Sequence, residues 1–317
     1  MTVAAIETNA LRKTYGGTVA LDGLDLRVER GEVFGLLGPN GAGKTTAVKL
    51  LLGLARPSGG DGRVLERPLG DREVRRRIGY LPELFRYQAW LTAREVLELH
   101  ATLAGIPGPA STRTAEIDRV LDLAGIASRS RDRTGGFSKG MQQRLGLAVA
   151  LLGDPELVVL DEPTSALDPV GRDDVRAIIR DARARGSTIV LNSHLLGEVE
   201  RVCDEVIIIH RGRVIAAGGL RALLGAPSLR IVVSGLGDPV GLLRTFAPVM
   251  VEHDHLLLQP IEPERTPEVV QALVAAGGRV HEVEPVQRSL EDLFLELVRS
   301  GVTEATESFR LPRPPAP

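Results

Sequence analysis

The chain has 317 residues, with 39 Lys and Arg against 41 Asp and Glu, which gives a net charge of −2 at pH 7. This length exceeds what one hydrophobic core usually organises, so the sequence predicts a large domain and a smaller one. The near-neutral charge does not indicate nucleic acid as the main partner, and none is expected. The single cysteine, Cys203, excludes an intrachain disulfide framework and a metal site built from several cysteines.

The sequence contains no candidate membrane span. No stretch reaches the roughly 18 consecutive apolar residues that a spanning helix needs. The first residues also lack the basic start and apolar run of a secretion signal. We therefore expect a cytoplasmic protein, which works at a membrane only if another subunit holds it there.

Short apolar runs without alternation predict strands that are buried on both faces, as in a parallel sheet. These runs cover residues 33–37, 157–160, 188–191 and 206–209. Between them lie helical patterns, in which apolar residues recur at i, i+3, i+4 and i+7. The two clearest patterns are Val48, Leu51, Leu52 and Ala55, and Val175, Ile178, Ile179 and Ala182. Strands that alternate with helices predict an α/β domain.

Residues 85–152 are expected to form a helical insertion into this sheet domain. Its first helix begins with a capping box of Thr92 and Glu95, ahead of the apolar residues Val96, Leu99 and Leu103. A second helix is expected over 113–123, and a third follows Ser138.

After residue 225 the composition changes to short strands and helices. Strands are expected at 229–233 and 280–283, and a last helix is capped by Ser289 and Asp292. The apolar stripe of that helix is Leu290, Leu293, Phe294 and Leu297. The predicted organisation is a domain at 1–226, a small α+β domain at 227–300 and a flexible proline-rich tail at 301–317.

The strongest motif is GPNGAGKT, which fits G-x-x-x-x-G-K-[ST] and stands between a predicted strand and a predicted helix. Its glycines let successive backbone N–H groups turn toward a phosphate chain, and the helix N-terminus adds the positive end of a dipole. Lys44 is expected to reach the β and γ phosphates, and the Thr45 hydroxyl to ligate Mg²⁺. The predicted phosphate-binding residues are Gly38, Pro39, Asn40, Gly41, Ala42, Gly43, Lys44, Thr45 and Thr46.

An acidic pair follows the strand expected at 157–160. Asp161 leaves that strand at its carboxyl end, where α/β sheets hold ligands, and is expected to orient Mg²⁺. Glu162 is placed to hold the attacking water and to accept its proton. Because 161 − 44 = 117 residues separate Asp161 from Lys44, the helical insertion lies between the two halves of the site.

Residues 137–144, FSKGMQQR, resemble the LSGGQ signature motif of ATP-binding-cassette (ABC) ATPases. Other motifs occur in the order of that family: Tyr15 before the phosphate loop, Glu83 at the Q-loop position, Asp168 in the D-loop and His194 as the switch histidine. The resemblance implies an α/β phosphate-loop NTPase of the ABC ATPase type. It also implies that ATP and Mg²⁺ lie between two copies of the chain, arranged head to tail.

The resemblance implies a role for each motif. Tyr15 would stack on adenine. Ser138 and Gly140, at a helix N-terminus, would grip the γ phosphate held by the second copy, and Asp168 would act across the same interface. His194 would hydrogen-bond the γ phosphate and help to hold the water.

Three residues depart from the common pattern. Glu83 stands where many relatives have glutamine, and Lys139 and Met141 replace a glycine and a glutamine of LSGGQ. These variants resemble the subfamily of type-2 ABC transporters, which includes daunorubicin-resistance-type exporters. In this setting Glu83 would contact metal or water, and its loop would touch a membrane partner.

The function implied is ATP hydrolysis that powers a separately encoded integral membrane permease, with export of a drug, antibiotic or other hydrophobic compound. The catalytic residues would be Lys44, Glu162 and His194, and the metal ligands Thr45, Glu83 and Asp161. The protein would be peripheral on the inner face of the cell membrane. Three roles stay open for the carboxyl-terminal domain: to regulate closure, to hold the dimer together or to cap the cassette. The apolar stripe of its last helix favours dimer support.

Two alternatives stay open. A soluble ABC ATPase that acts on ribosomes or DNA usually has two cassettes, long coiled coils or zinc modules. This chain has one cassette, no sustained heptads and one cysteine. A module that sequesters a drug without hydrolysis would have no use for Glu162 and His194.

Overall fold

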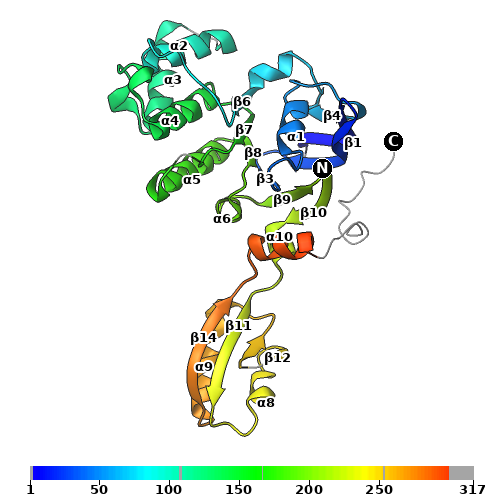
Figure 1. Cartoon of the computed structure of the whole chain (residues 1–317). Helices are drawn as coiled ribbons and strands as arrows, with labels where there is room; N and C mark the ends of the chain where they lie inside the picture. The colour runs from blue at the N-terminus through cyan, green and yellow to red at the C-terminus, as the bar shows by residue number, and fades with distance from the viewer. Residues whose placement is uncertain (1–2, 107–108, 166, 253, 300–317) are drawn as a thin grey trace. The chain divides into compact units, whose positions relative to one another are not determined.

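The computed structural model describes residues 3–106, 109–165, 167–252 and 254–299 (Figure 1). Within these ranges the chain divides into two compact units, and the second begins at Gly219. This division lies earlier than the boundary predicted at residue 226. The reason is that helix α7 (Leu220–Leu224) packs against α10 (Leu290–Arg299), a helix of the second unit. The predicted tail at 301–317 lies outside the described residues.

The first unit is built on a six-stranded sheet with the order β10-β9-β3-β8-β7-β6. Neighbouring strands from β9 to β6 run parallel. Every residue of β3, β7 and β8 is buried, which confirms the strands predicted from uninterrupted apolar runs. The strands are β3 (Val33–Leu37), β6 (Ile78–Leu81), β7 (Leu157–Asp161), β8 (Thr188–Asn192), β9 (Glu205–His210) and β10 (Arg213–Gly219).

A second, four-stranded sheet has the order β2-β1-β4-β5 and was not predicted. Its strands are β1 (Ala4–Tyr15), β2 (Thr18–Glu29), β4 (Gly59–Val64) and β5 (Arg67–Pro68). Gly16 and Gly17 join β1 to β2 with positive φ angles of 50° and 93°, as a two-residue hairpin requires. One hydrophobic core holds side chains from β1 and β2, from the strands of the larger sheet and from helix α1 (Lys44–Leu51).

The helical insertion is present where it was predicted. Its helices are α2 (Ala93–Ala104), α3 (Ala110–Leu123) and α4 (Lys139–Ala150). Thr92 and Glu95 form the predicted reciprocal capping box of α2. Of the three apolar residues expected after it, Val96 is buried, whereas Leu99 and Leu103 are exposed. Leu97, which was not among them, is buried as well. Two further helices, α5 (Pro169–Ala184) and α6 (Leu196–Glu200), precede and follow β8 in the chain.

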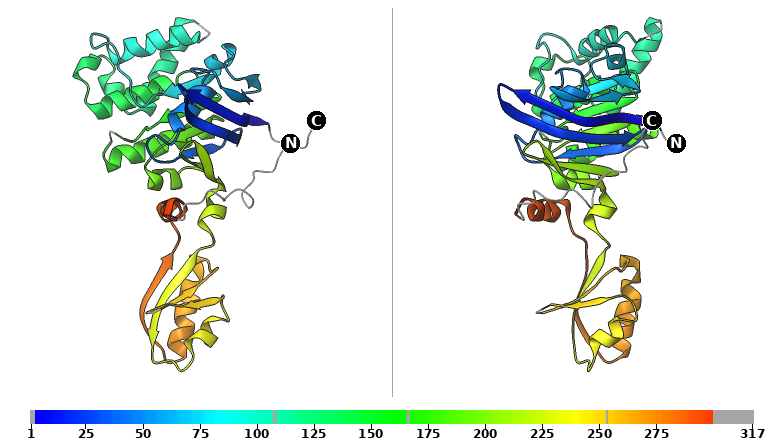
Figure 2. Two further views of the ribbon diagram at one scale, coloured as in Figure 1. Left: turned by 45° about the vertical axis from the view of Figure 1, so that its right-hand side comes forward. Right: turned by 90° about the vertical axis from the view of Figure 1, so that its right-hand side faces the viewer.

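The second unit is a four-stranded antiparallel sheet in the order β12-β13-β11-β14, with α9 along one face (Figure 2). Its elements are β11 (Ser228–Ser234), α8 (Pro239–Leu243), β12 (Val249–Val251), β13 (Leu256–Leu258), α9 (Thr266–Ala275), β14 (Arg279–Val286) and α10. Ser289 and Asp292 cap α10 as predicted, through bonds of 3.1 Å between side chain and backbone in both directions. Leu290 and Leu293 of its apolar stripe are buried. Within the described ranges, no helix has the length and apolar composition to cross a membrane.

One acidic residue of the first unit, Glu32, makes the stability of the folded chain depend on pH. Burial is the main reason that the pKa of Glu32 rises to about 7; negative charges on Glu29, Asp204 and Glu205 add to the effect. A hydrogen bond of 2.9 Å, donated by the Glu29 N–H to Glu32 Oε2, opposes it. The folded chain therefore binds this proton more tightly than the unfolded chain, whose carboxyl has the ordinary pKa of 4.5. The stability contributed by this proton is complete below pH 4.5 and is lost as the pH rises through about 7.

Glu32→Gln is expected to remove this loss, because glutamine keeps the acceptor oxygen but never ionises. At pH 8 the variant should be more stable by about 1 kcal/mol after allowance for solvent screening, or about 2–4 °C in Tm. At pH 4.5 and below, the two proteins should melt together. Thermal melts at both pH values provide the test, and a variant that is less stable at pH 8 would contradict the assignment.

Candidate functional site

The phosphate loop follows β3 and leads into α1. Gly38 has φ +145°, and a Cβ there would lie 2.1 Å from the carbonyl oxygen of Ile209, so only glycine fits this position. Lys44 begins α1 and is buried. Its Nζ donates hydrogen bonds to the carbonyl oxygens of Gly38, at 2.6 Å, and Pro39, at 3.3 Å. The ammonium group is thus held against the loop that is predicted to wrap the phosphates.

The electrostatic surroundings of Lys44 are acidic. Burial lowers the pKa of Lys44, although the negative charges of nearby carboxylates oppose the shift. These carboxylates belong to Glu162, Asp161 and Glu83. The structure therefore brings together four of the predicted site residues, which come from the start of α1 and from the carboxyl ends of β6 and β7 or just beyond them.

Asp161 is the last residue of β7 and is buried. It lies opposite Asn192 in the parallel pairing with β8, and Asn192 Nδ2 donates a hydrogen bond of 2.5 Å to Asp161 Oδ1. Burial raises the pKa of Asp161, while the bond from Asn192 lowers it. Sequence reasoning missed Asn192, although an amide at the end of an otherwise apolar strand run was a visible signal.

Glu162 follows in the left-handed backbone region, with φ +53°, which is uncommon for a residue with a side chain. Both of its carboxylate oxygens face His194. Oε1 accepts a bond of 2.9 Å from the His194 backbone N–H, and Oε2 lies 2.8 Å from His194 Nδ1, a contact that is attractive when Nδ1 carries a proton. Two residues predicted from separate motifs therefore meet in one contact, in which Glu162 is buried and the His194 side chain is half exposed.

The signature segment is built as a helix N-terminus. Ser138 caps α4, and its hydroxyl accepts a hydrogen bond of 3.2 Å from the Met141 N–H. Figure 1 shows α4 beside α2 and α3, on the opposite side of β6 and β7 from α1. Asp168 caps α5 in the same way, by accepting a bond of 2.8 Å from the Gly171 N–H.

A second residue that sequence reasoning missed connects this helix to the acidic pair. Gln143 is buried on α4, and its Nε2 donates a hydrogen bond of 2.9 Å to the carbonyl oxygen of Pro163. Pro163 directly follows Glu162 in the chain. The signature helix is therefore attached to the loop that holds the predicted general base.

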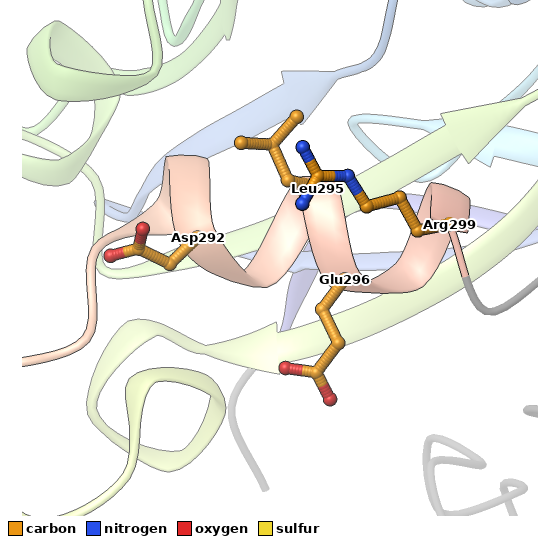
Figure 3. A pocket seen from close by; sticks show the side chains of 4 residues that line it. All are labelled: Asp292, Leu295, Glu296 and Arg299. Atoms are coloured by element: carbon orange, nitrogen blue, oxygen red, sulfur yellow. The ribbon is translucent and has the colours of Figure 1, made fainter. Parts of the chain in front are cut away.

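Tyr15, at the end of β1, is 46% exposed, and Lys13 Nζ lies 4.8 Å from its ring centroid. This partial exposure leaves ring surface free to stack on a base. A separate surface hollow lies on α10 of the second unit, where Figure 3 shows Asp292, Leu295, Glu296 and Arg299. It includes none of the predicted nucleotide-site residues, and the four described residues that line it come from a single helix.

The oxygen atoms of the predicted metal ligands are of the kind that Mg²⁺ prefers. Thr45 is exposed at the start of α1, and Asp161 and Glu83 supply carboxylates that act on Lys44. Among the described residues, no group of three or more His, Cys, Asp or Glu side chains is arranged as a metal cage. Mg²⁺ needs none, because it is usually held by one or two carboxylates, substrate phosphates and water. The Asn192 Oδ1 atom is buried beside Asp161 without a hydrogen-bond partner, which leaves an acceptor for a water of a hydrated cation.

Comparisons with known proteins agree with this geometry. A family model described as ABC transporter matches residues 21–165. The Nod factor export ATP-binding protein I of Rhizobium sp. is 37% identical over 306 residues, which cover 94% of this chain and 98% of that protein. The bacitracin transport ATP-binding protein of Bacillus licheniformis is 42% identical over 213 residues, which cover 66% of this chain and 68% of that protein.

Among solved structures, the dimeric structure of a bacterial ABC transporter cassette matches with a TM-score of 0.63 and 26% identity, over 68% of this chain and 99% of that chain. These likenesses confirm the predicted fold class: a phosphate-loop ABC ATPase with a helical subdomain and an additional carboxyl-terminal region. The chain therefore belongs to the ABC ATPase family and is an ATP-binding subunit of an ABC transporter.

Proposed function

We propose that this subunit hydrolyses Mg-ATP in a head-to-tail pair and so powers export through a separately encoded integral membrane permease, at the inner face of the cell membrane. The observation that carries the proposal is the cluster of Lys44, Asp161, Glu162 and His194 at the carboxyl ends of adjacent parallel strands. That edge is where α/β sheets hold their ligands.

The grip on phosphate comes from the loop and Lys44. The Lys44 ammonium now bonds to two loop carbonyls, and β and γ phosphate oxygens would be stronger, charged acceptors for the same donor. The first turn of α1 offers backbone N–H groups that no residue within the helix can satisfy. Binding of a triphosphate would therefore satisfy donors that the chain has already placed.

When bound, Mg²⁺ would neutralise charge on the β and γ phosphate oxygens. Thr45 and Asp161 would hold the ion, and Glu83 would act on it directly or through water. Glu162 would orient the attacking water and accept its proton. Its contact with His194 must loosen for a water to reach it, and a γ phosphate that accepts a hydrogen bond from the imidazole would provide the competing partner.

The second copy would complete the site. Ser138 and Gly140 at the N-terminus of α4 form a donor end that suits an anion, and Asp168 caps the N-terminus of the following helix, α5. The dimeric structure reported for a related cassette supports pairing of two such chains. When the second copy contacts α4, the hydrogen bond from Gln143 to Pro163 would transmit a displacement of α4 to the segment that holds Glu162 in the same chain.

Exposed apolar side chains favour a permease as the partner rather than a ribosome or DNA. Trp90 is 70% exposed in the segment between Glu83 and α2, and Leu103 on α2 is 72% exposed. Leu84 and Leu99 are also exposed. Leu99 and Leu103 are four residues apart on α2 and so share one face of that helix, and adjoining exposed apolar groups are typical of a protein interface. The names of the relatives, which export Nod factor or transport bacitracin, support export of a drug, antibiotic or other hydrophobic compound.

Leu103→Asp is expected to release the subunit from membranes that contain its permease, because a carboxylate in an apolar contact loses its hydration. The ATPase rate of the purified chain should stay unchanged, since Leu103 is none of the nucleotide-site residues. Leu54→Asp is the matched control, because Leu54 is 59% exposed in the segment that follows α1 and should leave membrane association intact. Fractionation with the permease co-expressed gives the measurement. Recovery of the wild-type chain with ribosomes would reject the proposal.

A further inference from the structure

Asn192 touches both members of the acidic pair. The residue is only 2% exposed, and its Nδ2 donates a hydrogen bond of 2.5 Å to Asp161 Oδ1. Its backbone carbonyl oxygen accepts a bond of 2.8 Å from the Glu162 N–H. Both contacts follow from the register of two parallel strands, in which Asp161 and Asn192 are directly paired.

The side-chain bond selects one orientation of the Asp161 carboxylate. Because Oδ1 is used by the Asn192 amide, Oδ2 is the oxygen that stays available to a cation. A neutral amide can hold a carboxylate in this way without adding charge, whereas leucine at the same position could not donate at all. The orientation of the Asp161 carboxylate is therefore fixed before any cation binds.

The oxygen of the Asn192 side-chain amide makes no hydrogen bond within the part of the chain that the structure describes. Asn192 Oδ1 is buried and has no hydrogen-bond partner among the described residues. A buried acceptor without a donor costs roughly 1–3 kcal/mol, so it calls for an explanation. A water of a hydrated divalent cation held by Asp161 would donate to this oxygen and remove the cost.

We infer that Asn192 is a positioning residue for the divalent cation. It orients Asp161 through Nδ2 and receives a water of the hydrated cation at Oδ1. The inference rests on the proposed role of Asp161 as a metal ligand. It adds a residue that none of the sequence motifs included, and it assigns a function to a buried polar atom that the fold leaves unsatisfied.

Asn192→Leu in the full chain is expected to weaken Mn²⁺ binding by about 10-fold or more, in line with other residues that orient metal ligands. Mn²⁺ is titrated in the presence of a non-hydrolysable ATP analogue, and the free ion is followed by electron paramagnetic resonance. Affinity for the analogue in excess chelator should stay unchanged, because the phosphate loop is untouched. A structural role alone would not separate these two readouts.

Thr188→Val is the matched control. Thr188 is buried at the other end of β8, and its Oγ1 accepts a hydrogen bond of 3.0 Å from the Gly31 N–H. The Thr188→Val substitution removes a hydrogen bond from the same strand at a distance from Asp161. The Mn²⁺ affinity of this variant should therefore stay within about twofold of wild type. If Asn192→Leu does not fold, Asn192→Ser is used, since its hydroxyl is too short to reach Asp161, and the same loss is expected.

Wild-type Mn²⁺ affinity in the Asn192 variants, or an equal loss in Thr188→Val, would overturn the inference. Asp161→Asn separates this failure from failure of the proposed function. If Asp161→Asn loses Mn²⁺ while the Asn192 variants keep it, only the positioning role is rejected. If Asp161→Asn keeps Mn²⁺, Asp161 is no metal ligand and both proposals fall.

Discussion

Glu162→Gln is expected to lower ATP hydrolysis by about 10²–10⁴-fold, the usual contribution of a general base. Glutamine has the same shape and keeps an oxygen that can accept the bond from the His194 N–H. It cannot take a proton from water. ATP binding should therefore persist while turnover stops, and phosphate release with Mg-ATP measures the difference.

The same variant should accumulate as an ATP-bound dimer, because hydrolysis is the step proposed to reopen the pair. Size-exclusion chromatography with and without Mg-ATP would reveal it. Glu198→Gln is a suitable control: Glu198 is another glutamate with little exposure, bonded at 2.6 Å to Arg176, with no proposed part in the chemistry. It should hydrolyse ATP at a rate close to that of wild type. Undiminished turnover by Glu162→Gln would remove Glu162 from its role.

Lys44→Met should weaken ATP binding by about 10²-fold, since hydrogen bonds to charged groups contribute roughly 1.5–3 kcal/mol each. The methionine side chain has similar length but neither charge nor donor. The loss should depend on the phosphates: AMP, which lacks the β and γ groups that Lys44 is proposed to contact, should bind the variant and the wild type almost equally. Titration calorimetry with ATP and AMP provides both values.

Lys49→Met controls for the general effect of removing a lysine from α1, because Lys49 is exposed on the same helix. It should bind ATP as the wild type does. Equal losses for ATP and AMP in Lys44→Met would indicate a damaged loop rather than a lost phosphate contact, and would count against the proposed role.

Local sequence was sufficient where one physical pattern repeats without interruption. The runs at 33–37 and 188–191 show no apolar-polar alternation because both faces of those strands are covered, and they were predicted correctly. Strands β1 and β2 escaped prediction because their pairing contains several register shifts. Ala10 of β1 also has a positive φ of 46°. Both features break the alternation by which a half-buried strand is normally found.

The same contrast holds within the site. Lys44 and Glu162 could be named from the sequence because each stands in a motif whose neighbours in the chain create its chemistry. The roles of Asn192 and Gln143 could not be assigned in this way, since they depend on hydrogen bonds to Asp161 and Pro163, which are far away in the sequence.

For this protein, the linear order of residues determined the class of fold, the phosphate loop and the acidic pair, because strand burial, glycine turns and helix caps depend on neighbours along the chain. The tertiary structure decided which side chains complete the site and which apolar residues stay exposed. It pairs Asp161 with Asn192, closes Glu162 onto His194 and leaves Leu103 uncovered. Strand register and helix packing set those contacts, and both are settled by the whole core at once rather than by any local segment.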